Sequence, residues 1–224
     1  MLLGIETAAE CAGVALADDE GVRAVVWVRG ERRHAETLAP AIGHVLEQGQ
    51  ASLADVDTVA LDVGPGLFTG LRVGVATAQG LAQGLGIGVL GVTSVAVLAR
   101  EVFDAGWRGQ VAAVVDARRK EVFAARYAAP TEEIEPPARR TPAELAASLV
   151  AAGEDDLVVV GTGAQRYPEL FAPLHVAAIS APSPAALVAL AAGRLRGGEK
   201  PIPPGLLRPM YLREADARIN WAQR

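Results

Sequence analysis

Aromatic residues and cysteine are scarce in this 224-residue sequence. Aromatic side chains make up 4% of the chain although 51% of its residues are hydrophobic, so the core must be built mainly from Ala, Val, Leu and Gly. A core of small side chains favours elements that approach one another closely over a wide aromatic-lined cavity. The single cysteine, Cys11, excludes an internal disulfide and a multi-thiolate metal site, and it suits a reducing compartment.

Lysine and a surplus of basic charge are lacking as well. Only two of the 21 basic residues are lysines, Lys120 and Lys200, and the net charge is −5. Proteins that hold nucleic acid by their own charge usually carry a basic face, so we do not expect this chain to bind nucleic acid alone. Glu6 and Glu10 interrupt the apolar N-terminus and no basic segment precedes it, which argues against a signal peptide or membrane span. The composition predicts a soluble cytoplasmic protein.

The first half of the chain alternates between strand and helix patterns. Apolar residues are continuous or alternate where strands are expected, and they recur every three to four residues where helices are expected. The pattern predicts strands at 2–6, 12–17, 22–28, 58–63 and 87–92, and helices at 34–48, 69–85 and 94–104, the last with Ser94 as its N-cap. The resulting order, β-β-β-α-β-α-β-α, is that of an α/β protein.

The second half begins in the same way. A hairpin of strands at 111–116 and 121–129 is followed by a Pro-rich loop at 132–137, a helix at 141–151 with Thr141 as N-cap, strands at 157–160 and 176–179, and a helix at 184–196. This repeated order predicts two related α/β lobes, residues 1–105 and 106–200. Residues 201–224 are expected to form an extended tail that packs back on the first lobe.

The turn Gly64-Pro65-Gly66 lies between a strand and a helix, where backbone N–H groups often bind phosphate. A Walker A loop requires a lysine at this point, and none occurs before Lys120. A dinucleotide fingerprint requires G-x-G-x-x-G, whereas these glycines fall at 64, 66 and 70. The turn therefore favours a close crossing of strand and helix over a phosphate site.

The helix at 69–85 contains four glycines, and each costs about 1 kcal/mol relative to alanine in a helix interior. Winding the helix places Gly70, Gly74, Ala78 and Leu81 along one line, with Val73, Thr77, Gly80 and Gly84 beside it. We interpret these lines as surfaces for close packing, both against the sheet of the same lobe and against another helix. The helix at 34–48 supplies part of that cover; the rest is either core or a protein interface.

Six segments resemble one known family. They are IETA at 5–8, HAETLAPAIGHVL at 34–46, GPGLFTGLRVGVATAQGLAQG at 64–84, LGVTSVAVLA at 90–99, DARRKEVFAARY at 116–127 and PMYLR at 209–213. In this order they closely resemble the TsaB (YeaZ) family over essentially the whole chain, and the segment at 64–84 is the most specific. The resemblance implies an actin/Hsp70-like ATPase (ASKHA) fold, with two ribonuclease-H-like lobes built on central mixed sheets flanked by helices.

The resemblance also implies a function. In that family the protein is the non-catalytic partner of its paralogue TsaD, and both serve the synthesis of N6-threonylcarbamoyladenosine at position 37 of tRNAs that read ANN codons. Contact through the first two helices would involve Leu38, Ile42, Val45, Gly70, Arg72, Val73, Gly74, Thr77 and Gly80. ATP and metal are expected on the partner and no tightly bound cofactor on this chain. The ATPase TsaE is expected as a third component, tRNA only through the complex, and a homodimer is compatible with the isolated chain.

Departures from the catalytic paralogue support a non-catalytic role. Its metal-binding histidine pair aligns with Ser94 and Leu98 in this sequence. Glu6 stands where nucleotide-handling members of the fold usually have Asp, so Glu6 and Thr7, with Asp116 and Arg118, are expected to form a residual nucleotide site or simple turns. The alternative is an independent ASKHA-fold enzyme, either a small-molecule kinase or ATPase or a glycoprotease-like hydrolase.

Overall fold

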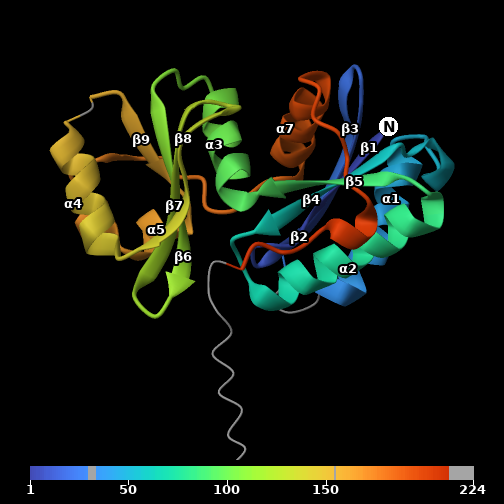
Figure 1. Cartoon of the computed structure of the whole chain (residues 1–224), viewed down its shortest axis with the longest axis horizontal. Coiled ribbons are helices and arrows are strands. Elements are labelled where there is room, and N and C mark those ends of the chain that lie inside the picture. The colour runs from blue at the N-terminus through green and yellow to red at the C-terminus, as the bar shows by residue number, and fades with distance from the viewer. Residues whose placement is uncertain (30–33, 154, 212–224) are drawn as a thin grey trace, which may run out of the picture.

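The computed structural model describes residues 1–29, 34–153 and 155–211, which form two lobes, each built around a five-stranded sheet (Figure 1). The first sheet has the order β3-β2-β1-β4-β5, with β1 (Leu2–Glu6), β2 (Cys11–Asp18), β3 (Gly21–Arg29), β4 (Thr58–Gly64) and β5 (Gly88–Thr93). β1 pairs antiparallel with β2 and parallel with β4, so the sheet is mixed. All residues of β1 and β4 are buried, as expected for central strands covered on both faces.

Helices cover both faces of the first sheet. α1 (His34–Gln48) and α2 (Phe68–Leu85) lie side by side on one face, while α3 (Ser94–Asp104) and α7 (Pro184–Arg196) pack on the other. Because α7 contacts β1, β2 and β3, the prediction that residues 106–200 form a separate lobe was wrong for this helix. α3 lies between the lobes and also contacts β6 and β7. Its apolar residues therefore pack against both sheets.

The second sheet has the order β10-β9-β6-β7-β8. Its elements are β6 (Gln110–Arg118), β7 (Glu121–Ala129), β8 (Glu132–Arg140), α4 (Pro142–Ala152), β9 (Leu157–Val160), α5 (Thr162–Arg166), α6 (Pro168–Phe171) and β10 (His175–Val176). The segment 132–137, predicted as a loop, is part of strand β8. Pro136 and Pro137 are tolerated there because β8 is an edge strand, on which a missing backbone donor can face solvent.

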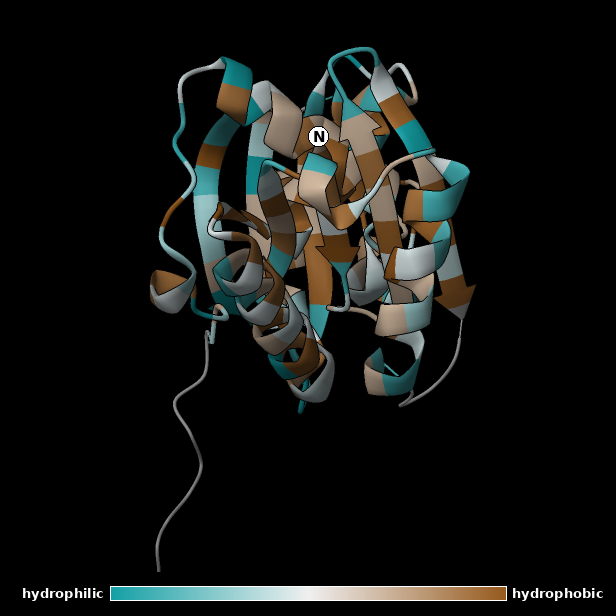
Figure 2. Ribbon diagram, turned by 90° about the vertical axis from the view of Figure 1, so that its right-hand side faces the viewer, coloured by the Kyte–Doolittle hydropathy of each residue, from teal (hydrophilic) through white to brown (hydrophobic). Residues whose placement is uncertain are grey.

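Hydropathy follows the layers of the structure, as Figure 2 shows: apolar residues fill the strands and the inner sides of the helices, and polar residues gather at turns and outer surfaces. Separate clusters lie between the first sheet and α1–α2, and between α4 and the second sheet. A third cluster joins the lobes through α3 and α7. Thr141 caps α4 as predicted, since its hydroxyl accepts a hydrogen bond from the Glu144 amide at 3.3 Å. None of the helices in the described part of the chain combines the length and apolar character that crossing a bilayer requires.

The described part of the C-terminal segment, residues 201–211, runs back over α2 and β5. Ile202 forms an isolated bridge with Val89, and the Met210 amide donates to the Val63 carbonyl at 2.7 Å. The Gln79 side-chain amide of α2 donates to the carbonyls of Pro204 (3.0 Å) and Leu207 (3.1 Å), within and just after the short helix η2 (Pro204–Leu206). The rest of the predicted tail, residues 212–224, lies outside the described residues.

Replacing Gln79 by alanine should loosen this segment without unfolding the chain. Two hydrogen bonds are lost, which lowers the free energy of local opening by about 1–2 kcal/mol. Amide exchange at Ile202 and Met210 should become about tenfold faster or more. The exposed Gln83, one turn further along α2, provides the control in Gln83→Ala. Unchanged protection in Gln79→Ala would show that the other contacts alone hold the segment.

Candidate functional site

The helical glycines of α2 fall into two groups with different surroundings. A Cβ atom at Gly70 would lie 2.0 Å from the Thr7 carbonyl oxygen, and one at Gly74 would lie 2.3 Å from the Thr7 hydroxyl oxygen. Both glycines are buried. They let α2 cross directly over the segment after β1, and Gly70 also lies close to α1, since its Cβ atom would be 3.4 Å from His34 Nε2.

The second group faces outward. Gly80 and Gly84 of α2 and Gly43 of α1 are exposed, and a Cβ atom on any of them would meet nothing within 4 Å. Glycine in a helix interior costs about 1 kcal/mol relative to alanine. Contacts within the described chain give no reason for that cost at these three positions. The outer surface of α1 and α2 therefore has a backbone that another molecule can approach closely.

The structure divides the nine residues predicted to contact a partner. Five of them are buried within this chain, which corrects that assignment: Leu38, Ile42, Val45, Gly70 and Gly74. The three apolar side chains hold α1 against the sheet because they project from its inner face. The other four remain on the surface: Arg72 and Gly80 are exposed, and Val73 and Thr77 are half-buried. On α1, exposed Ala39, Pro40 and Gly43 extend this outer surface.

An aromatic and cationic cluster lies at the start of α2. The Arg72 guanidinium lies 3.9 Å from the centre of the Phe68 ring, and the Phe68 and Tyr211 ring centres are 5.4 Å apart. Phe68 is 51% exposed and Tyr211 is 46% exposed. Such exposure is unusual in a chain with so few aromatic side chains available for its core. The sequence analysis did not single out either residue, although Phe68 lies two residues after the Gly64-Pro65-Gly66 turn.

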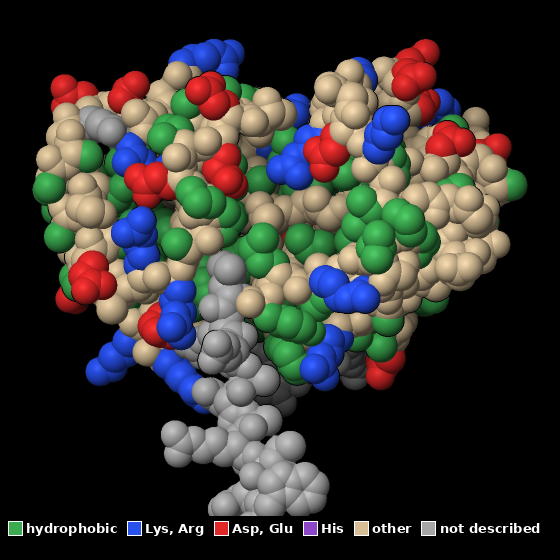
Figure 3. Space-filling model, viewed as in Figure 1, with side chains coloured by type: hydrophobic (Ala, Val, Ile, Leu, Met, Phe, Trp, Pro, Cys, Tyr) green, Lys and Arg blue, Asp and Glu red, His purple; other side chains and the backbone are tan. Residues whose placement is uncertain are grey.

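A cleft of about 1350 Å³ separates the two lobes. Its walls include Glu10 after β1, Phe68 at the start of α2, Arg118 at the tip of the β6–β7 hairpin, Arg166 of α5 and Tyr211. On the face seen in Figure 3, acidic and basic side chains are interspersed around the lobes and do not form one basic surface. The cleft is large enough for a small molecule.

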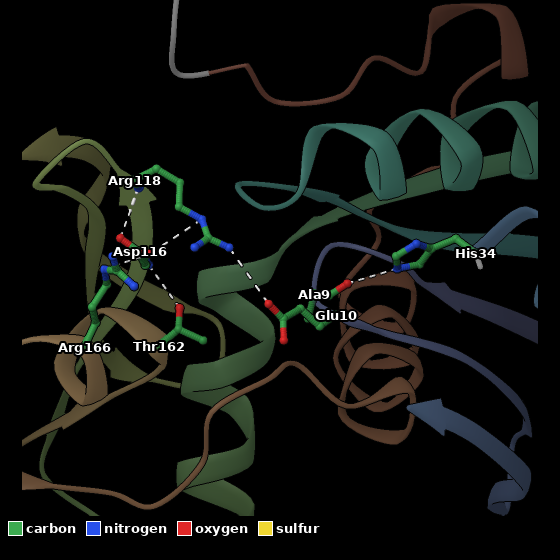
Figure 4. A network of polar contacts seen from close by, with 7 residues as sticks. All are labelled: Ala9, Glu10, His34, Asp116, Arg118, Thr162 and Arg166. Carbon is green, nitrogen blue, oxygen red and sulfur yellow. Dashed lines mark hydrogen bonds and ion pairs between the residues drawn. The ribbon is translucent and has the colours of Figure 1, made fainter. Parts of the chain in front are cut away.

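Four charged groups of the cleft, Glu10, Asp116, Arg118 and Arg166, form ion pairs with one another (Figure 4). Asp116 faces Arg118 at 3.7 Å and Arg166 at 3.4 Å, and its backbone amide donates to the Thr162 hydroxyl. Arg118 also reaches across the cleft to Glu10, at 3.9 Å. Both arginines thus face carboxylates of the chain itself.

The four residues predicted for a residual nucleotide site do not come together. Asp116 and Arg118 line the cleft, whereas Glu6 and Thr7 are 0% exposed and lie beneath it. Glu6 instead neighbours Asp62, whose role sequence reasoning missed. Burial, and then the charge of Asp62, raise the pKa of Glu6 well above its usual value, and burial raises the pKa of Asp62.

The N-terminus of α3 also differs from the prediction. Ser94 was expected to cap the helix, but the Thr93 hydroxyl accepts the hydrogen bond from the Ala96 amide at 3.3 Å. The Ser94 hydroxyl donates to Asp62 at 2.6 Å instead. Leu98, four residues on, is part of the apolar core. Among the described residues, no group of three or more His, Cys, Asp or Glu side chains is arranged to hold a metal ion.

Comparisons with known proteins identify the family. A family model described as TsaD, tRNA N6-adenosine threonylcarbamoyltransferase, matches residues 25–221. The Escherichia coli (strain K12) tRNA threonylcarbamoyladenosine biosynthesis protein TsaB is 34% identical over 173 residues, which cover 75% of this chain and 74% of the relative. The chain belongs to the TsaB (YeaZ) family. A Mycobacterium tuberculosis (strain ATCC 25618 / H37Rv) protein is 35% identical over 219 residues, covering 97% of this chain and 93% of the relative.

Solved TsaB-family structures share the fold. YeaZ from Pseudomonas aeruginosa matches with a TM-score of 0.81 at 28% identity, covering 93% of this chain and 99% of that one. A second P. aeruginosa structure, of a protein with similarity to peptidase YEAZ, matches with a TM-score of 0.86 at 31% identity, covering 95% and 99%. The predicted ASKHA fold with two mixed sheets flanked by helices is thereby confirmed.

Proposed function

We propose that this TsaB-family chain is a non-catalytic subunit that binds and activates TsaD, the paralogue that transfers the threonylcarbamoyl group. The product would be N6-threonylcarbamoyladenosine at position 37 of tRNAs reading ANN codons. The name of the E. coli relative, a tRNA threonylcarbamoyladenosine biosynthesis protein, supports this pathway. ATP and metal would be held by the partner, TsaE would be a third component, and the complex would work in the cytoplasm.

The observation that carries the proposal is the outer surface of α1 and α2. Exposed Gly43, Gly80 and Gly84 lower helix propensity and gain no packing from the described chain. Such positions are explained when the backbone of a second protein approaches there, because a side chain would hold the two surfaces apart. Half-buried Val73 and Thr77 add apolar area on the same side of α2 as Gly80 and Gly84.

A second candidate is an independent ASKHA-fold enzyme, and the cleft of about 1350 Å³ favours it. The matched arginines and carboxylates of the cleft weigh against it. Phosphate groups would have to displace Asp116 and Glu10 from Arg118. A kinase or ATPase normally leaves such cations facing its phosphate site.

Reconstitution tests the proposal directly. TsaD, TsaE, ATP, threonine, bicarbonate, the enzyme that forms threonylcarbamoyl-adenylate and a tRNA reading ANN codons are combined with and without this chain. Modified adenosine should form only when the chain is present, and the chain alone should hydrolyse ATP negligibly. Full modification without the chain would contradict the activator role, and robust ATP turnover by the chain alone would favour the second candidate.

A further inference from the structure

Two carboxyl groups lie side by side beneath the cleft, at the ends of neighbouring parallel strands. Ile5 of β1 is paired with Leu61 of β4, so Glu6 and Asp62 occupy the next position of the same register. Residues at matching positions of parallel neighbours point to the same face of a sheet. Both side chains are 0% exposed, and the hydroxyl of Ser94 at the start of α3 lies against Asp62.

Each carboxyl group has one oxygen satisfied and one without a donor. Glu6 Oε1 accepts from the Ala8 amide at 2.7 Å, and Asp62 Oδ1 accepts from the Gly64 amide at 2.7 Å and the Ser94 hydroxyl at 2.6 Å. Within the described residues, Glu6 Oε2 and Asp62 Oδ2 have no hydrogen-bond partner when both groups are ionised. The strand register and the burial place the two carboxyl groups next to each other.

Two buried carboxylates so placed would repel each other and leave two oxygens unsatisfied, which is costly away from water. One proton between the free oxygens removes one charge and supplies both with a hydrogen bond. We propose that Glu6 and Asp62 share a single buried proton that completes the hydrogen bonds of both groups and joins β1 to β4 beneath the cleft. This inference is independent of the proposed partner.

The donors around the pair place the proton on Glu6. Asp62 Oδ1 accepts two hydrogen bonds, which favour its ionised form, whereas Glu6 accepts one from the backbone. Glu6 Oε2 is therefore the donor and Asp62 Oδ2 the acceptor. The burial that raises the pKa of Glu6 acts in the same direction.

One further titratable group acts on the pair. The charge of Glu101 in α3 adds to the rise in the pKa of Glu6. Burial raises the pKa of Glu101 to about 7, although the Glu101 side chain accepts a hydrogen bond from the Ser183 amide at 2.6 Å. The other group of α3 next to the pair is the uncharged Ser94. The residues of α7 that pack on Gly4 of β1, Leu187 and Val188, are apolar. Measurements in a Glu101→Gln background isolate the pair.

The shared proton sets the sign of a pH dependence. The folded chain keeps a proton that the unfolded chain releases above the usual pKa of glutamate, 4.5. Folding therefore takes up a proton, and the free energy of unfolding falls as the pH rises from about 4.5 through the raised value of the folded state. A fully ionised pair would show no such fall.

Three variants test the proposal by urea unfolding from pH 5 to pH 9, with Glu101→Gln as the parent. Glu6→Gln and Asp62→Asn each keep the accepting oxygen and provide an amide that donates to the remaining carboxylate, so each should remove most of the pH dependence. The double variant places two amide donors against each other. Its folding equilibrium constant should be lower than that of either single variant by about 30-fold or more.

The parent protein supplies a second measurement if any variant fails to fold. Its infrared spectrum at pH 7 should contain the band of a protonated carboxyl group, and Glu6→Gln should remove that band. Absence of the band, or additive effects of the two substitutions, would overturn the proposal. Stabilisation of the parent by Na⁺ or Mg²⁺ that either single variant abolishes would also overturn it, because a cation would then occupy the place of the proton.

Discussion

Gly70→Ala should destabilise the chain by about 3 kcal/mol or more, although it adds a single methyl group. The new Cβ atom would lie 2.0 Å from the Thr7 carbonyl oxygen. That oxygen belongs to the backbone and no rotamer change can remove it, so α2 must move off the sheet. Urea or thermal unfolding measures the loss directly.

The same substitution at Gly80 provides the matched control, since both glycines lie in α2. A Cβ atom at Gly80 meets nothing within 4 Å, so Gly80→Ala should stabilise the chain by about 0.5–1 kcal/mol through helix propensity. We therefore expect Gly70→Ala to lower the free energy of unfolding and Gly80→Ala to raise it. Stabilisation by both to a similar extent would show that helix propensity, and not the contact with Thr7, governs the effect of the substitution.

Gly80→Leu should abolish or strongly weaken binding to TsaD while leaving the fold intact. A leucine side chain on the outer surface would hold the two proteins apart, and we expect the dissociation constant to rise about 30-fold or more. Formation of threonylcarbamoyladenosine should fall in parallel. Calorimetric titration with purified TsaD and the reconstituted modification assay measure the two effects.

Gly193→Leu is the control for this second prediction. Gly193 also lies in a helix with open space around its Cβ position, but its helix, α7, packs on the opposite face of the first sheet. Binding to TsaD should be unchanged in this variant. If Gly80→Leu binds TsaD as the natural sequence does, the outer surface of α1 and α2 is not the contact and the proposed function loses its main support.

The sequence predicts most elements because their apolar patterns are strong. The expected bounds of α1 and of α7 match the structure. Apolar spacing sets those of α1, whereas Pro184 begins α7 and Gly197 follows its last residue. β8 was missed because two prolines are typical of loops, and sequence alone does not reveal that this strand lies at an edge. The position of α7 was missed because its pattern indicates a buried helix without indicating which sheet it covers.

The candidate site could be predicted only in outline. Winding α2 into a helix shows that its glycines share a side but does not show which of them meet their own chain. Gly70 and Gly74 are explained by Thr7, more than sixty residues earlier in the sequence, and such contacts leave no local signal. The Glu6–Asp62 pair was missed for a related reason, because only the strand register brings the two carboxyl groups together.

Because α7 packs on the first sheet, its position determines the order in which the two lobes can finish folding during synthesis. Residues 1–105 leave the ribosome first, yet the face of β1, β2 and β3 that α7 covers stays open until residue 196 has been made. The earliest lobe is therefore the last to bury its core. A nascent chain stopped after residue 140 would contain three of the five strands of the second sheet and an uncovered apolar surface on the first sheet, the kind of surface that chaperones bind.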